Sequence, residues 1–349
     1  MKKFQPDYIN MIQAASNIKP KRMPLYEHGV GLKVMQDILN KKFSGLYSGN
    51  ESDKKEYLRN FCNFYKTMGY DVVSFDQNIG GFMPGSGALA SEKPGIIKNR
   101  EDFEKYPWDS IPDIFFEKTS VYFKLLGEVM PEGMKAIGGP GNGIFECVQD
   151  VVGFTQLCYI TIDDPELYDD LFKKVGETNY KIWERFLKEF SDTYAVCRFG
   201  DDLGFKSGTL LAPNDIKSKI VPEYKKIIEL IHSYNKPFVY HSCGNIIDVM
   251  DYIISEAKID SKHSNEDAIA PFTDWVDKFG DRIGNFGGID VDILCRSSEQ
   301  VIKDCTKAII NYCTVKKGFA FGSGNSIADY VPVSGYIAMI EAAREARGE

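Results

Sequence analysis

Several features that would place the chain in other classes are absent from its 349 residues. No apolar run approaches the roughly 18 residues of a transmembrane helix, and no hydrophobic signal segment follows Met1, Lys2 and Lys3. There is no concentrated basic run and the formal net charge is -8, so neither nucleic acid nor an anionic membrane is expected as a partner. We therefore expect a cytoplasmic protein that binds neither.

Two further patterns are also missing. The eight cysteines form no paired framework, so we interpret most of them as buried thiols that pack like small apolar side chains. The glycine turns Gly85–Gly87 and Gly141–Gly143 do not match G-x-G-x-x-G, the fingerprint of dinucleotide binding. A doubly wound open sheet is the second-ranked architecture, and it lacks the phosphate-binding motif that would favour it.

Hydrophobic residues make up 43% of the chain and charged residues 26%, as in ordinary globular proteins. Short apolar segments alternate with longer helical ones, for example the helix that Asp164 and Pro165 start and that we expect to end near Phe190. Eight strands, each followed by a helix, predict one α/β domain over residues 1–349, a (β/α)8 TIM barrel with an N-terminal helical extension. The predicted strands are Met23–His28, Asp71–Phe75, Met134–Gly138, Tyr194–Phe199, Phe238–Tyr240, Ile259–His263, Arg282–Gly287 and Gly318–Phe321.

The segment Gln77–Pro112, after the second predicted strand, is rich in Gly, Pro and Ser. Loops this long inside a compact domain are usually insertions or covers of a site. We expect this insertion to pass over the mouth of the barrel.

Polar side chains gather at the predicted strand ends, which is where catalytic residues of TIM barrels lie. Polar loops would supply some of them by chance, but six of the eight strands contribute, so we predict a site on this face. The candidates are Glu27, His28, Asp201, Asp202, His241, Cys243, His263, Glu266, Asp290, Ser323 and Asn325.

The stretch Pro237–Asn245 carries the most specific chemistry. Residues two apart in a strand point to the same side, so His241 and Cys243 project together where Phe238–Tyr240 ends. Imidazole and thiolate are preferred zinc ligands, and the carboxylate of a Glu at the strand ends would complete three ligands with a fourth position open, as in catalytic zinc sites. A buried cysteine beside a hydrogen-bonded histidine is the simpler alternative.

Four motifs in this order resemble the uroporphyrinogen decarboxylase superfamily, and most of all its corrinoid-linked methyltransferase branch. The similarity extends over nearly the whole chain. The motifs are RFGDDLGFKSG from Arg198, HSCGN from His241, GGIDVDIL from Gly287 and FGSGNSI from Phe321.

The resemblance separates two branches. True decarboxylases carry an arginine-rich segment, RQAGR, where this chain reads PLYEHGV from Pro24 to Val30, and Glu27 would repel the carboxylates of a porphyrinogen. The methyltransferase branch holds zinc through His-x-Cys and a later Cys, but Ser323 stands in the place of that Cys. The related cobalamin-independent methionine synthases use a Glu about twenty residues beyond His-x-Cys, so the resemblance implies His241, Cys243 and Glu266 as ligands.

The resemblance implies a zinc-dependent methyltransferase that moves a methyl group between a small methylated compound or acceptor and a corrinoid (cobalamin) held by a small corrinoid-binding protein. Asp201 or Asp202 would position or deprotonate the substrate, or cap their loop. A uroporphyrinogen decarboxylase of haem synthesis and a non-catalytic corrinoid- or tetrapyrrole-binding module are the alternatives. The resemblance leaves open which compound donates the methyl group, in which direction it moves and whether the chain forms a homodimer. The remaining candidates are Asp290 as a catalytic residue and Glu27, His28, His263, Ser323 and Asn325 as substrate contacts.

Overall fold

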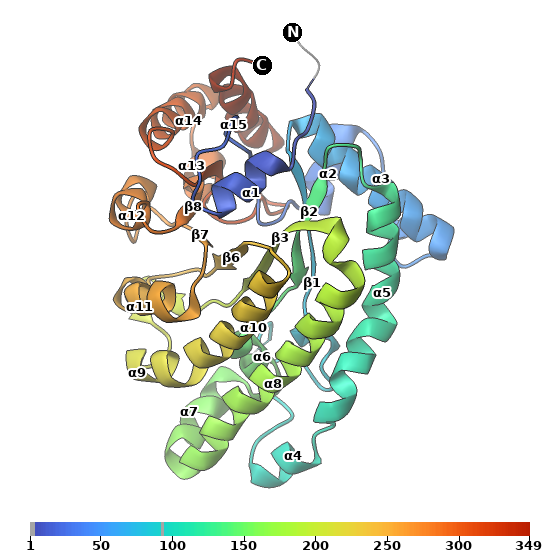
Figure 1. Cartoon of the computed structure of the whole chain (residues 1–349), viewed down its shortest axis with the longest axis vertical. Coiled ribbons are helices and arrows are strands. Elements are labelled where there is room, and N and C mark those ends of the chain that lie inside the picture. The colour runs from blue at the N-terminus through green and yellow to red at the C-terminus, as the bar shows by residue number, and fades with distance from the viewer. Residues whose placement is uncertain (1–3, 92–93) are drawn as a thin grey trace.

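The computed structural model describes residues 4–91 and 94–349 of the chain. Helices surround a curled parallel sheet, and both termini lie at one end of the molecule (Figure 1). The α-helices are α1 (Ile9–Ala15), α2 (Leu32–Leu39), α3 (Glu51–Met68), α4 (Arg100–Lys105), α5 (Ile111–Val129), α6 (Ile144–Val152), α7 (Phe154–Asp163), α8 (Pro165–Phe190), α9 (Pro213–Asp215), α10 (Val221–Ser233), α11 (Ile247–Tyr252), α12 (Phe272–Phe279), α13 (Val291–Arg296), α14 (Glu299–Cys313) and α15 (Val333–Ala346).

The sheet contains seven strands in the order β1-β2-β3-β6-β7-β8-β9, and every neighbouring pair is parallel. Parallel neighbours that follow one another in sequence and are joined by helices confirm the predicted TIM-barrel-like fold. A small antiparallel hairpin, β4–β5, lies outside this sheet. The strands are β1 (Val72–Gln77), β2 (Lys135–Pro140), β3 (Tyr194–Gly200), β4 (Gly204–Phe205), β5 (Gly208–Thr209), β6 (Phe238–His241), β7 (Ser261–His263), β8 (Gly284–Ile289) and β9 (Phe319–Ser323).

The segment predicted as the first strand, Met23–His28, is the exception. It pairs with β9 only through an isolated bridge between Leu25 and Phe321, while the Ser74 hydroxyl of β1 donates to the His28 carbonyl. Pro24 has no N–H to donate to a ladder, which is one reason the pairing stays short. The segment nevertheless lies between β9 and β1, so its side chains reach the same end of the sheet as those of the regular strands.

Helix α1 closes the amino-terminal end of the barrel (Figure 1). Its side chains Met11, Ala14 and Ala15 are completely buried. They pack against side chains that point into the barrel, such as Val196 of β3 and Val239 of β6. Apolar side chains therefore fill this end of the barrel, and the candidate site residues lie at the carboxyl end of the strands.

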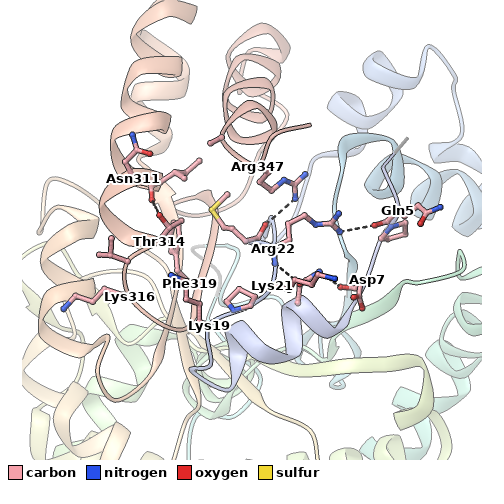
Figure 2. A pocket seen from close by; sticks show the side chains of 17 residues that line it. Gln5, Asp7, Lys19, Lys21, Arg22, Asn311, Thr314, Lys316, Phe319 and Arg347 are labelled. Carbon is pink, nitrogen blue, oxygen red and sulfur yellow. Dashed lines mark hydrogen bonds between the residues drawn. The ribbon is translucent and has the colours of Figure 1, made fainter. Parts of the chain in front are cut away.

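A cavity of about 990 Å³ lies between the N-terminal segment, the end of α14 and the C-terminus (Figure 2). Its arginines have structural partners: Arg22 pairs with Asp71, and Arg347 donates to the Gly69 carbonyl at 3.1 Å. Both guanidinium groups also lie over the ring of Phe4. These contacts join the two ends of the chain, and the cavity is far from the carboxyl ends of the strands.

The predicted helix start at Asp164 is confirmed. The Asp164 carboxylate accepts a hydrogen bond from the Leu167 N–H at 2.8 Å, and Pro165 begins α8, which ends at Phe190. The apolar face of α8 buries Trp183 and Phe186 against the barrel wall. Long helices anchored in this way hold the strand ends in register.

The insertion after β1 packs along α6. The backbone N–H groups of Gly95 and Ile97 donate to the carbonyls of Val152 and Val151. Its first turn, with Gly81 and Phe82, lines a cavity at the barrel mouth that His28 also lines. Among the described residues, no helix has the length and apolar character needed to cross a membrane.

Candidate metal centre

His241 and Cys243 lie together at the carboxyl end of β6. His241 is the last residue of the strand, and its Nε2 is 3.4 Å from the Cys243 Sγ. Gly244, with φ of 76°, turns the chain, and a Cβ at this position would lie 2.1 Å from the Gly204 carbonyl carbon. The glycine is therefore required where hairpin β4–β5 crosses the loop that carries the thiol.

Asp202 joins this pair from the loop after β3. Its Oδ1 accepts a hydrogen bond from the Cys243 N–H at 2.8 Å and is 3.7 Å from the His241 Nε2. The ligand atoms of the three residues all lie within 4.8 Å of one another. Zinc–ligand bonds of about 2.0 to 2.3 Å in a tetrahedron separate ligand atoms by about 3.3 to 3.6 Å. The distances from His241 Nε2 to the Cys243 sulfur and the Asp202 oxygen are close to that range, so the three side chains form a candidate zinc site.

In the absence of a cation, the surroundings of Cys243 do not stabilise its thiolate. Burial, together with the Asp202 carboxylate, raises the pKa of the Cys243 thiol to about 12. The Asn325 amide acts in the opposite direction, because it donates a hydrogen bond to Sγ at 3.3 Å and so favours charge on the sulfur. A bound cation would supply the remaining stabilisation and convert the thiol into a thiolate ligand.

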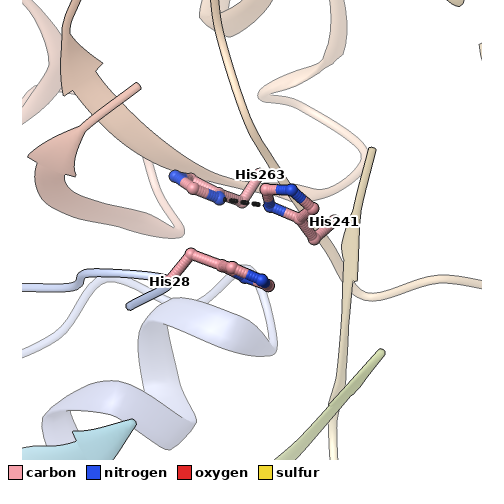
Figure 3. A group of neighbouring side chains, drawn as sticks. All are labelled: His28, His241 and His263. Atoms are coloured by element: carbon pink, nitrogen blue, oxygen red, sulfur yellow. Dashed lines mark hydrogen bonds between the residues drawn. The ribbon is translucent and has the colours of Figure 1, made fainter. Parts of the chain in front are cut away.

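Three of the four histidines, His28, His241 and His263, form a stack beside this set (Figure 3). The rings of His28 and His241 are 3.8 Å apart, and the Nδ1 atoms of His241 and His263 are 2.8 Å apart. Burial is the main cause that lowers the pKa of all three imidazoles. The 2.8 Å distance is shorter than the roughly 3.3 Å between two nitrogens on one tetrahedral zinc, so we interpret this contact as a hydrogen bond.

The structure does not bring Glu266 to His241 and Cys243. Glu266 is absent from the metal-ligand groups of the described residues and instead lines a cavity of about 350 Å³ together with Asp290. The side chain of Asn265 holds the turn by bonding to both the N–H and the C=O of Gly288. Glu266 follows in this turn after β7 and is not grouped with His241 and Cys243, so the predicted three-ligand set is not assembled.

Asp201 and Asp290 both accept hydrogen bonds from backbone N–H groups, and Asp290 also lines the 350 Å³ cavity. The fully buried carboxylate of Asp201 accepts from the N–H groups of Phe145 and Glu146 at 2.9 and 2.8 Å. Asp290 accepts from the N–H of Asp292 at 2.7 Å and so caps α13. Asp201 therefore holds the N-terminal turn of α6, while Asp202 lies beside the Cys243 thiol. The roles predicted for this pair toward a substrate stay predictions.

Glu27 and Ser323 form a second buried pair. Ser323 donates to the Glu27 carboxylate through its N–H, at 3.0 Å, and through its hydroxyl. Burial raises the pKa of Glu27 to about 8. The Ser323 hydroxyl is directed toward Glu27, and the Ser323 carbonyl is 3.1 Å from the His263 Nε2. Among the described residues, Glu27 does not belong to a group of His, Cys, Asp and Glu side chains that could hold a metal ion.

The sequence analysis missed Arg198 and Glu146. Arg198, 1% exposed, lies inside the barrel, where its guanidinium pairs with Asp76 and donates to the Ser74 hydroxyl at 2.8 Å. Strand alternation could have found it, because Val196 on the same strand also points inward. Glu146 accepts from the Asp202 N–H at 3.3 Å, and burial raises its pKa well above the usual value. In the sequence, Glu146 has the pattern of an ordinary acidic residue in the first turn of a helix.

A cavity of about 410 Å³ opens next to the histidine stack. His28, Ser74, Asp76 and Gln77 provide its polar lining. Its apolar lining is mainly aromatic, from Tyr47, Tyr57, Phe61, Phe75 and Phe82. His28 lines this cavity, and its Nδ1 is buried without a hydrogen-bond partner.

The family model described as uroporphyrinogen decarboxylase (URO-D) matches residues 90–346. Among solved structures, a methyltransferase from Methanosarcina mazei is similar, with a TM-score of 0.72, 13% identity and coverage of 96% of this chain and 97% of that chain. A D-allulose 3-epimerase from Methylomonas sp. reaches a TM-score of 0.44 at 11% identity, covering 94% and 99%. No curated protein matches the chain. At these identities the solved structures show the fold alone.

Proposed function

Since the chain belongs to the uroporphyrinogen decarboxylase family, we propose that it is a methyltransferase of that family. In this proposal it moves a methyl group between a small molecule and the corrinoid of a partner protein, with a zinc ion held by His241, Cys243 and Asp202. The observation that carries the proposal is the grouping of an imidazole, a thiol and a carboxylate at the barrel mouth. The fold shared with the methyltransferase from Methanosarcina mazei supports the choice of reaction.

Three protein ligands leave one position of a tetrahedral zinc ion open, and zinc in such a site acts as a Lewis acid on the heteroatom that gives or receives the methyl group. The charges of a Cys243 thiolate and an Asp202 carboxylate would offset those of the cation. The corrinoid would supply the cobalt that exchanges the methyl group.

The chain's own residues bind and orient the small molecule. The aromatic side chains of the 410 Å³ cavity exclude water, and the neutral imidazole of His28 offers Nδ1 as a hydrogen-bonding atom. Because His28 stacks on His241 at 3.8 Å, a molecule bound there lies beside the ligand set. Asn325 contacts Cys243 and also lines the cavity of Glu266 and Asp290, so it lies between the sulfur and that cavity.

Decarboxylation of a porphyrinogen, the alternative, is disfavoured by the lining of the two cavities. A substrate with several propionates needs cationic partners. Among the described residues, those that line the cavity beside His28 include no Lys or Arg, and those that line the cavity beside Glu266 include one cation, Lys206. Arg198 is buried and already paired with Asp76.

The first test is metal content and reaction. Protein purified after growth with zinc is expected to contain about one zinc per chain and to alter the visible absorbance of methylcobalamin or reduced cobalamin in the presence of an acceptor or a methyl donor. Uroporphyrinogen is expected to remain unchanged. Absence of zinc, with no thermal stabilisation on adding it, would reject the metal site, and formation of coproporphyrinogen would favour the alternative.

The second test asks which carboxylate, that of Asp202 or that of Glu266, is a zinc ligand. Asp202→Asn is expected to weaken zinc binding by more than the roughly 10 to 100-fold typical of an outer contact, and Cys243→Ser by at least as much. Glu266→Gln is the matched control and should keep the zinc affinity of the wild type, because Glu266 lies outside the ligand group. Zinc lost in Glu266→Gln and kept in Asp202→Asn would restore the ligand set predicted from the sequence.

A further inference from the structure

His263 is linked to the proposed zinc ligand His241 by a chain of hydrogen bonds (Figure 3). The His263 Nε2 is 3.1 Å from the Ser323 carbonyl, and its Nδ1 is 2.8 Å from the His241 Nδ1. The other nitrogen of His241, Nε2, faces Cys243 and Asp202. The order of donors and acceptors along this chain decides which nitrogen of His241 carries a proton.

The Ser323 carbonyl, at one end of this chain of hydrogen bonds, fixes the order of donors and acceptors. A carbonyl oxygen can only accept, so the His263 Nε2 carries the hydrogen. A neutral imidazole with a hydrogen on Nε2 has a lone pair on Nδ1. The His263 Nδ1 therefore accepts, and the His241 Nδ1 must be the donor. That leaves the lone pair of His241 on Nε2, directed at the proposed metal position.

The neutral state of His263 has its own physical support. The side chain is completely buried, and two cations, Arg198 and Lys262, lie near it. A further positive charge on this ring would be buried beside these two cations, so the neutral imidazole is favoured. A doubly protonated His263 would instead donate at Nδ1 and force a hydrogen onto the His241 Nε2.

The Ser323 carbonyl is itself held in place. Glu27 accepts from both the N–H and the hydroxyl of Ser323, and the Gly324 N–H donates to the Ile289 carbonyl of β8. The acceptor that starts the chain is therefore part of the strand ends, and it belongs to the backbone of Ser323, whichever side chain this residue has.

We infer that His263 is a positioning residue that holds His241 in the tautomer with a hydrogen on Nδ1 and a lone pair on Nε2. The inference rests on the proposed function for its purpose, because a ligand nitrogen must be free of its proton to bind a metal. The tautomers of these two buried histidines are also defined in the metal-free protein.

The test is nitrogen NMR of metal-free protein labelled with ¹⁵N-histidine. The two-bond correlations between ring nitrogens and carbon-bound protons distinguish the two tautomers. We expect His241 with a hydrogen on Nδ1 and His263 with a hydrogen on Nε2, in the wild type and in His232→Asn, a control at a histidine that pairs with Asp260 instead. A hydrogen on the His241 Nε2 in the wild type would overturn the inference.

Two variants of His263 test the cause. His263→Leu removes the acceptor, so His241 should lose its single tautomer and zinc affinity should fall roughly 10 to 100-fold. His263→Asn keeps an acceptor oxygen near the place of Nδ1 and should recover the tautomer and most of the affinity. An unchanged His241 spectrum and zinc affinity in His263→Leu would overturn the inference, as would a loss in His263→Asn equal to that in His263→Leu.

The two proposals can fail separately. The tautomer is measured without metal, so a wild-type protein that binds no zinc would reject the proposed function, while the nitrogen spectra would still decide the role of His263. Should His263→Leu fail to fold, the wild-type and His263→Asn spectra decide the question.

Discussion

Glu27 should make the stability of the protein depend on pH in an unusual direction. Its carboxyl is 1% exposed, and burial raises its pKa from the usual 4.5 to about 8. The folded state therefore binds the proton more tightly than the unfolded state. This contribution to stability is complete below pH 4.5 and is lost as the pH rises through about 8. At about 1.36 kcal/mol for each pKa unit, the loss is on the order of 5 kcal/mol.

Replacing Glu27 by Gln isolates this contribution. The amide has the shape of the protonated acid and does not titrate, so the free energy of unfolding of Glu27→Gln, relative to the wild type, should increase by about 5 kcal/mol between about pH 4.5 and pH 8.5. Guanidinium chloride unfolding at several pH values measures the difference. Glu56→Gln is the control, because Lys41 and Arg59 lower the pKa of Glu56 to about 2, outside this interval. A Glu27→Gln difference that stays constant with pH would refute the reasoning.

Two further changes test the barrel interior. Asp76→Asn leaves the buried Arg198 guanidinium without its counter-charge and should lower the free energy of unfolding by about 3 to 5 kcal/mol, measured by chemical denaturation; a loss below about 1 kcal/mol would contradict this view of the pair. Gly322→Ala places a Cβ 1.7 Å from the Tyr26 carbonyl oxygen and should abolish soluble folded protein, whereas Gly45→Ala, whose Cβ meets nothing within 4 Å, should keep the wild-type melting temperature. Equal melting temperatures for the two alanine variants would contradict the steric argument.

The fold and the first two residues of the candidate site could be predicted because they depend on local patterns. Apolar segments separated by helices predicted the parallel sheet, and seven strands appear within a few residues of their predicted positions. His241 and Cys243 share a direction because strand residues alternate, which needs no knowledge of the rest of the chain. The first predicted strand pairs with β9 only through an isolated bridge, and Pro24, which cannot donate to a ladder, is one local signal of this in the sequence.

The third member of the set could not be predicted in this way. Asp202 reaches Cys243 across 41 positions of sequence, through a loop that hairpin β4–β5 and the Cys243 N–H hold in place. Glu266 stands closer to Cys243 in sequence, but the bonds of Asn265 to Gly288 turn it away. The alternation rule ends with the strand, and beyond it the direction of a carboxylate depends on contacts between loops from different strands.

Ser323 shows how a departure from a family pattern can be compatible with the proposed metal site. The resemblance puts a ligand cysteine at this position, and a serine hydroxyl would be a poor replacement. The structure directs that hydroxyl to Glu27 and places Asp202 beside Cys243, so in the proposed site the third ligand comes from β3 instead of β9. What Ser323 contributes is its carbonyl oxygen, which His263 contacts and which any residue at that position would provide. Ser323→Ala should therefore leave the His241 tautomer and the zinc affinity nearly unchanged, and a loss of zinc in that variant would show that the hydroxyl itself is a ligand.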